Sequence, residues 1–343
     1  MRYGKKSVSP ALRNVRIEAA CRRSARAIGC SLVAFLLSLP PARADVVADW
    51  TRIALHTVIS SEQHLSRAAR EMATVHVAMF ESMNFMEGSY IPRFVVKLPQ
   101  PLGGSSDTAA AAAAHHVLVQ LHPEQEGALD AALQHSVAAI PDAEKSSALI
   151  TGKSLGAIVY SIWTPDPNQA RSDISGSMSK TSRVRASTRG SGAIAVAWYW
   201  MIAQIAEGQR LRPIESARLY ALVSMALSDL YGANRDATRF PESAHLCGPC
   251  AASAAVQVIL DSELGTAGIS GMTLTGPGAT GAAYVSSRIR EYGRGLSSEQ
   301  PDGGVSRQTS IEAGEKAGRA IGLRALANYR PLPAPVVATY TAD

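Results

Sequence analysis

Residues 66–80 read SRAAREMATVHVAMF, a stretch that contains neither glycine nor proline. Its apolar side chains recur every three or four positions and cover a wide face, the pattern of an α-helix buried in a core. His76 lies within this stretch. Its apolar neighbours favour a hydrogen-bonded core histidine over a metal ligand. We therefore expect a helical core built around residues 66–80.

The same helical period continues along the chain, without the alternation of apolar and polar residues typical of strands. The sequence thus predicts an all-α fold, a helical bundle. Asp107 is expected to cap one helix, and Pro213 to occupy the first turn of another. Residues 165–192 are rich in Ser, Gly and Arg and predict a flexible loop. Further helices are predicted over residues 107–121, 124–140, 142–163, 193–205, 213–230, 249–260, 282–292 and 310–329.

The first 44 residues have the layout of a secretory signal peptide. Nine Lys and Arg residues lie between Arg2 and Arg43, with Glu18 the only acid among them. The apolar stretch 27–37 follows, too short to span a bilayer, and residues 42–44 read ARA, the small-x-small pattern of a cleavage site. We expect an exported protein, periplasmic or extracellular, that begins at Asp45. The alternative is a buried N-terminal helix.

Removal of this segment changes the charge of the protein. The whole chain has 34 Lys and Arg against 28 Asp and Glu, a net charge of +6. Without the nine bases and one acid of the leader, 25 bases face 27 acids, a net charge of −2. The basic pI therefore belongs to the leader, and a nucleic-acid partner is not expected. No later stretch is long and apolar enough to be a transmembrane helix.

Cys21 and Cys30 lie in the leader, whereas Cys247 and Cys250 stay in the body as Cys-Gly-Pro-Cys. In an oxidising compartment this pair favours a structural disulfide that locks the turn before a helix. The tetrapeptide also resembles the thioredoxin redox motif, although a βαβ context is absent. A metal site is the third interpretation, and it lacks two further ligands at zinc spacing.

Several motifs together resemble one superfamily, the bacterial vanadium-dependent haloperoxidases and the type-2 phosphatidic acid phosphatases. Residues 66–84 carry the pattern SxAARxxAxVHxAMFxxxN, and residues 117–123 carry VLxxLHP. Residues 303–322 carry GGVSxxxSxxAGxxxGxxIG. The resemblance covers most of the chain after the leader, with apparent deletions near residues 165–190 and 233–240. It implies a helical bundle around one oxyanion site, which holds vanadate in the peroxidases and a substrate phosphate in the phosphatases.

In that superfamily, Lys and Arg neutralise the anion and amides at a helix start cradle it. One histidine bonds the metal or attacks phosphorus, and a second acts as acid and base. This chain departs from both histidine positions: the acid/base position reads Pro249 and the ligand position reads Ser306. The arginine that precedes the Gly-Gly motif falls on Gln300.

The resemblance therefore implies an oxyanion pocket in the C-terminal helical half, residues 193–343, which the loop separates from the N-terminal half, residues 45–164. The oxyanion-binding candidates are Arg235, Arg239, Gly248 and Arg307, and the catalytic candidates are His245 and Ser306. Vanadate is the candidate cofactor, and a small anion or phosphate ester is the candidate partner; no other metal site is expected.

Three functions stay open. The first is an oxyanion enzyme with impaired or altered catalysis, of the peroxidase or phosphoric monoester hydrolase class. The second is a non-catalytic binding or structural protein on the same scaffold. The third is a dithiol-disulfide oxidoreductase at Cys247 and Cys250.

Overall fold

The computed structural model describes residues 45–60, 65–93, 103–163, 188–233, 247–269, 273–274, 283–284 and 306–329. The chain divides into two units, Met1–Ala44 and Asp45–Asp343. The first unit, which contains the predicted signal peptide, lies outside the described residues. The second unit contains the core.

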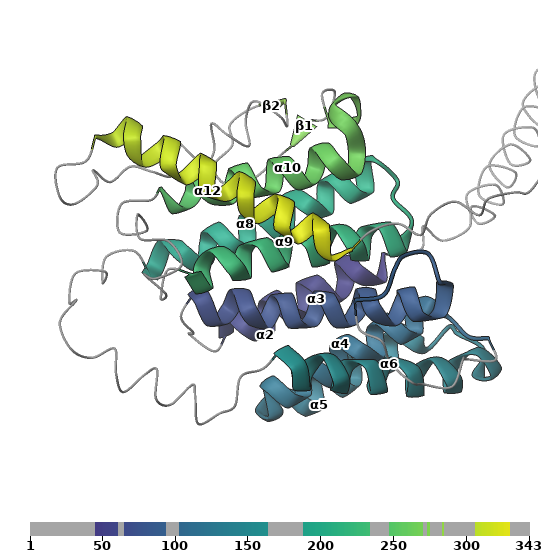
Figure 1. The fold of residues 1–343 in the computed structure, drawn as a ribbon. Coiled ribbons are helices and arrows are strands. Elements are labelled where there is room, and N and C mark those ends of the chain that lie inside the picture. Colours follow the sequence, from purple (N-terminus) through teal and green to yellow (C-terminus); the bar gives the residue numbers. More distant parts are fainter. Residues whose placement is uncertain are drawn as a thin grey trace, which may run out of the picture. The chain divides into compact units, whose positions relative to one another are not determined.

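The described residues are almost entirely helical, which confirms the predicted all-α fold (Figure 1). None of these helices is long and apolar enough to cross a bilayer. The only described strands, β1 (Thr273–Leu274) and β2 (Ala283–Tyr284), form a two-residue antiparallel ladder. In chain order the helices are α2 (Val46–Ser60), α3 (Leu65–Glu87), α4 (Ser106–Leu121), the short 3-10 helix η1 (Pro123–Gln125), α5 (Glu126–Val137), α6 (Asp142–Trp163), α8 (Thr188–Gly208), α9 (Pro213–Ala233), α10 (Gly248–Ile269) and α12 (Arg307–Asn328).

Four local predictions need correction. Ser105, and not Asp107, caps α4, because its hydroxyl accepts the amide of Thr108 at 3.2 Å. Helix α8 begins at Thr188, inside the predicted loop 165–192, and strand β2 stands where the helix 282–292 was expected. Helix α2 was not predicted at all. Pro213 does begin α9, as its missing N–H allows at a first turn.

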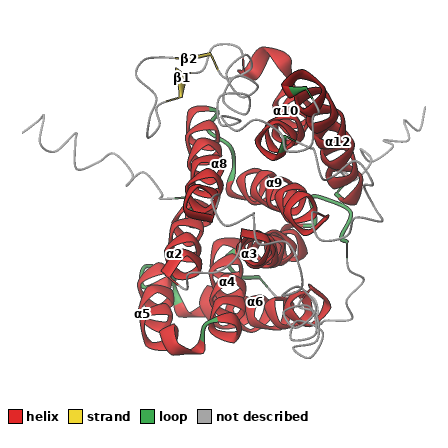
Figure 2. Ribbon diagram, turned by 90° about the vertical axis from the view of Figure 1, so that its left-hand side faces the viewer, coloured by secondary structure: helices red, strands yellow, loops and turns green. Residues whose placement is uncertain are grey.

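Helices α3 and α9 pack along each other at the centre of the unit (Figure 2). The α4–α6 pair covers one side of them and the α10–α12 pair covers the other. The packed α3–α9 faces bury large side chains, among them Phe80 and Tyr220. Helix α9 also buries an apolar stripe in the core; it consists of Leu219, Leu222, Val223, Ala226 and Leu230.

The described helices form two halves with the same order and the same contacts. In the first half α3, α4 and α6 pack on one another, and in the second half α9, α10 and α12 do the same. Helix α2 touches α9 while α8 touches α3, and the two central helices touch each other. This reciprocal pattern is the one expected of two copies related by an approximate two-fold axis.

The two halves also share sequence. The pattern ARxxAxVxxA begins at Ala69 in α3 and again at Ala217 in α9. Residues 152–156 of α6 read GKSLG, and residues 318–322 of α12 read GRAIG. Few other positions are identical between the halves, and the segments between these motifs differ in length.

Glycines join each outer helix pair in the same way. Gly152 and Gly156 of α6 lie against Ala109 and Ala113 of α4, where a Cβ would overlap backbone carbonyl groups. Gly318 and Gly322 of α12 lie against Ala251 and Ala255 of α10.

A backbone hydrogen bond is repeated as well. The amide of Ser105 donates to Glu144 O at 3.4 Å, and the amide of Cys247 donates to Ser310 O at 3.2 Å. In both pairs, a contact four residues further along one helix is made to a residue four further along the other helix. The two helices of each pair are therefore parallel. Each pair therefore brings the amino ends of its two helices to the same side.

His76 lies where α3 meets α9 and is fully buried. Its Nδ1 is 2.6 Å from Ser224 Oγ, and its Nε2 is 2.9 Å from Thr51 Oγ1. Thr51 donates its own proton to Val47 O, so it accepts from Nε2–H, and Nδ1 accepts from Ser224. Burial lowers the pKa of His76 to about 3. The prediction of a hydrogen-bonded core histidine is confirmed.

Candidate functional site

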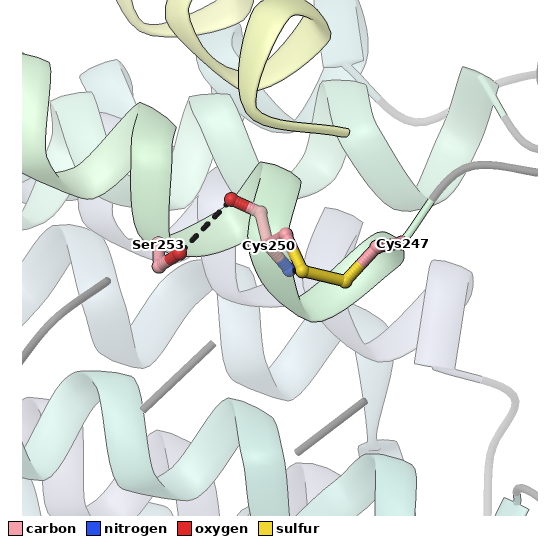
Figure 3. Close-up of a disulfide and its surroundings, with 3 residues drawn as sticks. All are labelled: Cys247, Cys250 and Ser253. Atoms are coloured by element: carbon pink, nitrogen blue, oxygen red, sulfur yellow. Dashed lines mark hydrogen bonds between the residues drawn. A yellow bond between two sulfur atoms is a disulfide. The ribbon is translucent and has the colours of Figure 1, made fainter. Parts of the chain in front are cut away.

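The Cys-Gly-Pro-Cys segment begins α10, as its sequence suggested (Figure 3). Gly248 is the first residue of the helix, and Pro249 lies in the first turn. Amides of the first turn have no acceptor within the helix, so the missing N–H of proline costs nothing there. The sulfur atoms of Cys247 and Cys250 are joined as a disulfide. Ser253 donates its hydroxyl proton to Cys250 O at 2.9 Å, one turn further along.

The first turn of α10 has few amides to offer an anion. The amide of Cys247 donates to Ser310 O, and the amide of Cys250 donates to Cys247 Sγ at 3.2 Å. Ala251 donates to Cys247 O at 3.0 Å, and Pro249 has no N–H. Within the described part of this turn, Gly248 is the remaining donor. A Cβ at Gly248 would meet nothing within 4 Å, so the backbone here is open to approach.

Ser306 caps α12 instead of pointing a ligand at a metal. Its hydroxyl accepts the amide of Thr309 at 3.1 Å and lies 2.8 Å from the hydroxyl of Thr309. Both Ser306 and Arg307 are exposed. The hydroxyl of Ser306 therefore satisfies a free amide at a helix start, the ordinary role of serine at this position.

The starts of α10 and α12 lie at the same end of the pair but are staggered. Gly314 touches Cys247. Eight residues separate Ser306 from Gly314, which is about 12 Å along an α-helix. A single tetrahedral oxyanion is smaller than this, even with a hydrogen bond on each side. An anion bound at Gly248 would therefore reach α12 through a long side chain such as that of Arg307, and not through the backbone of Ser306.

The remaining site candidates, Arg235, Arg239 and His245, lie outside the described residues, as does Gln300. Among the residues that the structure does describe, no group of three or more His, Cys, Asp and Glu is placed to hold a metal ion. The two positions at which the motif resemblance implies histidine hold proline and a capping serine, so the described residues supply no imidazole there. These residues do not fit a vanadium bonded to protein nitrogen.

Sequence reasoning missed two buried ionic groups that the fold assembles away from this site. Glu71 of α3 is 3.0 Å from His122 Nε2 and 2.8 Å from Arg67 Nε. Arg218 of α9 is 2.8 Å from Glu263 Oε2 of α10. The available signal was the charge itself: Glu71 and Arg218 interrupt otherwise apolar stripes of central helices, and such residues need partners.

Comparison with known proteins supports the fold. No family model matches the sequence, and no curated protein matches it. The structure resembles the crystal structure of a bacterial vanadium-dependent iodoperoxidase, with a TM-score of 0.58 and 13% sequence identity. The match covers 86% of this chain and 98% of that one. The chain thus has the all-α fold of the vanadium haloperoxidases, in agreement with the resemblance of its motifs.

Proposed function

We propose that this chain is an exported protein that binds a small oxyanion, vanadate or phosphate, at the start of α10. We further propose that it lacks the imidazole chemistry of the vanadium haloperoxidases. The chemistry of the two helix starts supports this proposal. The start of α10 has the Gly248 amide at the positive end of a helix dipole, which attracts anions, and a Cβ at Gly248 would meet nothing within 4 Å among the described residues. The two positions that need histidine hold Pro249 and Ser306.

Each residue of the proposed pocket has a limited role. The Gly248 amide donates one hydrogen bond to the anion. Arg307 brings a positive charge from α12, and Arg235 and Arg239 are the further cations proposed for the pocket. His245 is the remaining imidazole near the turn in sequence, and it is the proposed acid and base if any catalysis survives.

Calorimetric titration of the purified protein with orthovanadate and with phosphate tests the binding. The Arg307→Ala variant is expected to weaken binding roughly threefold to tenfold, since an exposed charge contributes about 1 kcal/mol. Arg319→Ala is the matched control, because Arg319 is an exposed arginine on the same helix. If neither vanadate nor phosphate shows saturable binding, the proposed pocket is rejected.

Halide oxidation by peroxide with added vanadate, and hydrolysis of p-nitrophenyl phosphate, test the proposed loss of catalysis. We expect both rates to stay at background. Turnover in either assay shows that the chemistry is intact and that residues outside the two family positions supply it. In that case Pro249 takes no part in the reaction, and the Pro249→Ala variant should turn over the substrate at the wild-type rate.

A non-catalytic scaffold is the second candidate. It is favoured because most backbone amides at the start of α10 are not available to bind an anion. Three of the four backbone positions from Cys247 to Cys250 either lack an N–H or donate it within the protein. This candidate predicts that Arg235→Ala and Arg239→Ala leave anion binding unchanged.

The dithiol oxidoreductase finds less support in the described residues. The side chain of Cys250 is fully buried and only 5% of Cys247 is exposed, whereas exchange requires an accessible sulfur. A reduction potential below about −300 mV would identify a structural bridge. Export is tested by sequencing the amino terminus of the protein recovered outside the cytoplasm, which we expect to be Asp45.

A further inference from the structure

A cavity of about 520 Å³ lies at the opposite end of α10 from the candidate oxyanion site. Fourteen residues separate Gly248 from Ser262 in its wall, which is about 21 Å along a helix. The cavity has the size of a small-molecule site. Its walls come from the chain after α3, the beginning of α9 and the end of α10, and include Tyr90, Arg212, Glu215, Arg218, Glu263 and Leu264.

The equivalent corner of the first half is built differently. Arg218 and Leu219 correspond to Arg70 and Glu71. In the first half, the buried Glu71 pairs with His122, and η1 follows at once and brings Glu124 to 3.4 Å from His122 Nδ1. The second half has an apolar Leu219 in place of Glu71 and Leu264 in place of His122. The buried charge there is held instead by Arg218 and Glu263.

Arg218 is the central group of the cavity wall and is only 6% exposed. Its guanidinium donates to Glu263 at 2.8 Å and to Tyr329 O at 2.7 Å, and it lies 4.8 Å from the centre of the Tyr90 ring. Among the described residues its Nε is buried without a hydrogen-bond acceptor. Each terminal nitrogen of the guanidinium carries two protons, so after its bonds to Glu263 and Tyr329 the group keeps protons that it can donate to a ligand oxygen.

The charges of the wall are balanced. Arg212 pairs with Glu215 at 2.9 Å and Arg218 pairs with Glu263 at 2.8 Å, and three leucines, two serines and Tyr90 line the remainder. A purely anionic ligand would meet both carboxylates, and a purely cationic ligand would meet both guanidinium groups. A ligand that carries both charges can add an attractive contact to each ion pair without placing a charge beside one of its own sign.

We propose that this cavity binds a small zwitterion of the free α-amino acid class. Its carboxylate would lie on the Arg218 and Arg212 side and its ammonium group on the Glu263 and Glu215 side, with a short apolar body against the leucines. Burial raises the pKa of Glu263. A nearby ammonium group would favour the ionised form of that carboxyl and so offset the cost of its burial.

Calorimetry on the purified protein with L-leucine as the probe tests the proposal. Its two single-charge analogues, 4-methylpentanoate without the amine and 3-methylbutylamine without the carboxylate, are titrated in parallel. We expect saturable binding of leucine and at least roughly tenfold weaker binding of each analogue, because each loses one charged contact worth about 1.4 kcal/mol or more. Equal binding of either analogue, or no leucine binding up to 10 mM, which is the limit of the titration, overturns the proposal.

Two variants locate the site. Arg212→Ala is expected to weaken leucine binding severalfold without unfolding the protein, because 62% of the Arg212 side chain is exposed. Arg70→Ala is the matched control from the other half and should leave leucine binding unchanged. If Arg212→Ala has no effect, or if Arg70→Ala weakens leucine binding as much as Arg212→Ala does, the ligand does not occupy this cavity. Vanadate binding at α10 is a separate measurement and does not decide this one.

Discussion

The two halves of this protein have similar helix interfaces but different helix ends. Both outer pairs place a Gly-x-x-x-Gly segment on alanines of a parallel partner, and both use the same amide-to-carbonyl bond at the start of the pair. The outer pair of the first half, α4 and α6, begins with the acidic residues Asp107, Asp142 and Glu144. The second half has Cys-Gly-Pro-Cys and Ser306-Arg307 at its helix starts.

This difference indicates which parts of the repeat are free to change. Close helix packing depends on backbone contact, which only glycine permits at these positions, so both halves keep it. The caps at the helix starts do not depend on this backbone contact and admit different side chains, as Ser105 and Cys247 show. An oxyanion site is therefore plausible only in the second half, because acidic side chains at the start of the first pair would repel an anion.

The largest expected effect comes from filling the glycine interfaces. Gly152→Leu and Gly318→Leu should each prevent folding, and the alanine variants should lose about 1–3 kcal/mol in the free energy of unfolding, since the new atoms overlap backbone. Urea denaturation measures the loss. Gly127→Ala in α5 is the control, because its Cβ would meet nothing within 4 Å, and it should be neutral or stabilising. A loss confined to one half would contradict the equivalence of the two interfaces.

Acid should destabilise the contact between the halves. The pKa of His76 is about 3 in the folded protein, below its ordinary value of 6.5, so the unfolded chain binds the additional proton. Relative to a variant without this histidine, the free energy of unfolding is therefore expected to fall as the pH drops below 6.5, by about 3 kcal/mol at pH 4. Thermal denaturation across this range measures it.

His76→Gln is the comparison for this acid effect, because it keeps a polar side chain and removes the titration. Burial also raises the pKa of Glu81 to about 7, which acts in the opposite direction. That contribution is common to both proteins and cancels in the difference. Parallel stability curves for the wild type and the variant would show that His76 does not titrate in this way.

Exchanging the caps of the equivalent helices should have a smaller effect. Cys247 and Cys250 correspond to Ser105 and Thr108, and in both halves the first side chain accepts the amide of the second at 3.2 Å. The double variant Cys247→Ser, Cys250→Thr should lose no more than about 2 kcal/mol, because so short a loop gives a disulfide little entropic effect. Melting with and without reductant measures this. A larger loss would show that the disulfide supports more than the turn.

The smallest expected effect is the loss of a single cap. Ser105→Ala and Ser306→Ala should each cost about 1 kcal/mol, because each removes the acceptor for one first-turn amide. Urea denaturation can resolve this change. If Ser306→Ala also abolishes anion binding, Ser306 acts on the ligand and not only as a cap.

The sequence predicted the helical class and the position of most helices because apolar periodicity survives in single helices such as residues 66–80. It also identified His76 as a core histidine and the Cys-Gly-Pro-Cys segment as a helix start. It could not place the cap at Ser105, because Asp107 is an equally good acceptor. It could not find the Arg218–Glu263 pair, since its partners are 45 residues apart and only packing brings α9 and α10 together.

The contact between His76 and Ser224 has a consequence for the history of the chain. The two residues occupy corresponding positions in the halves and touch each other. In a symmetric dimer of identical subunits, this contact would be made by two histidines or by two serines. Neither combination gives the observed order, in which Ser224 donates to His76, His76 donates to Thr51, and Thr51 donates to Val47 O. Only two covalently linked or otherwise distinguishable copies can evolve different residues on the two sides of one axis. The present hydrogen-bond chain therefore requires two different halves and could not have formed in an identical pair.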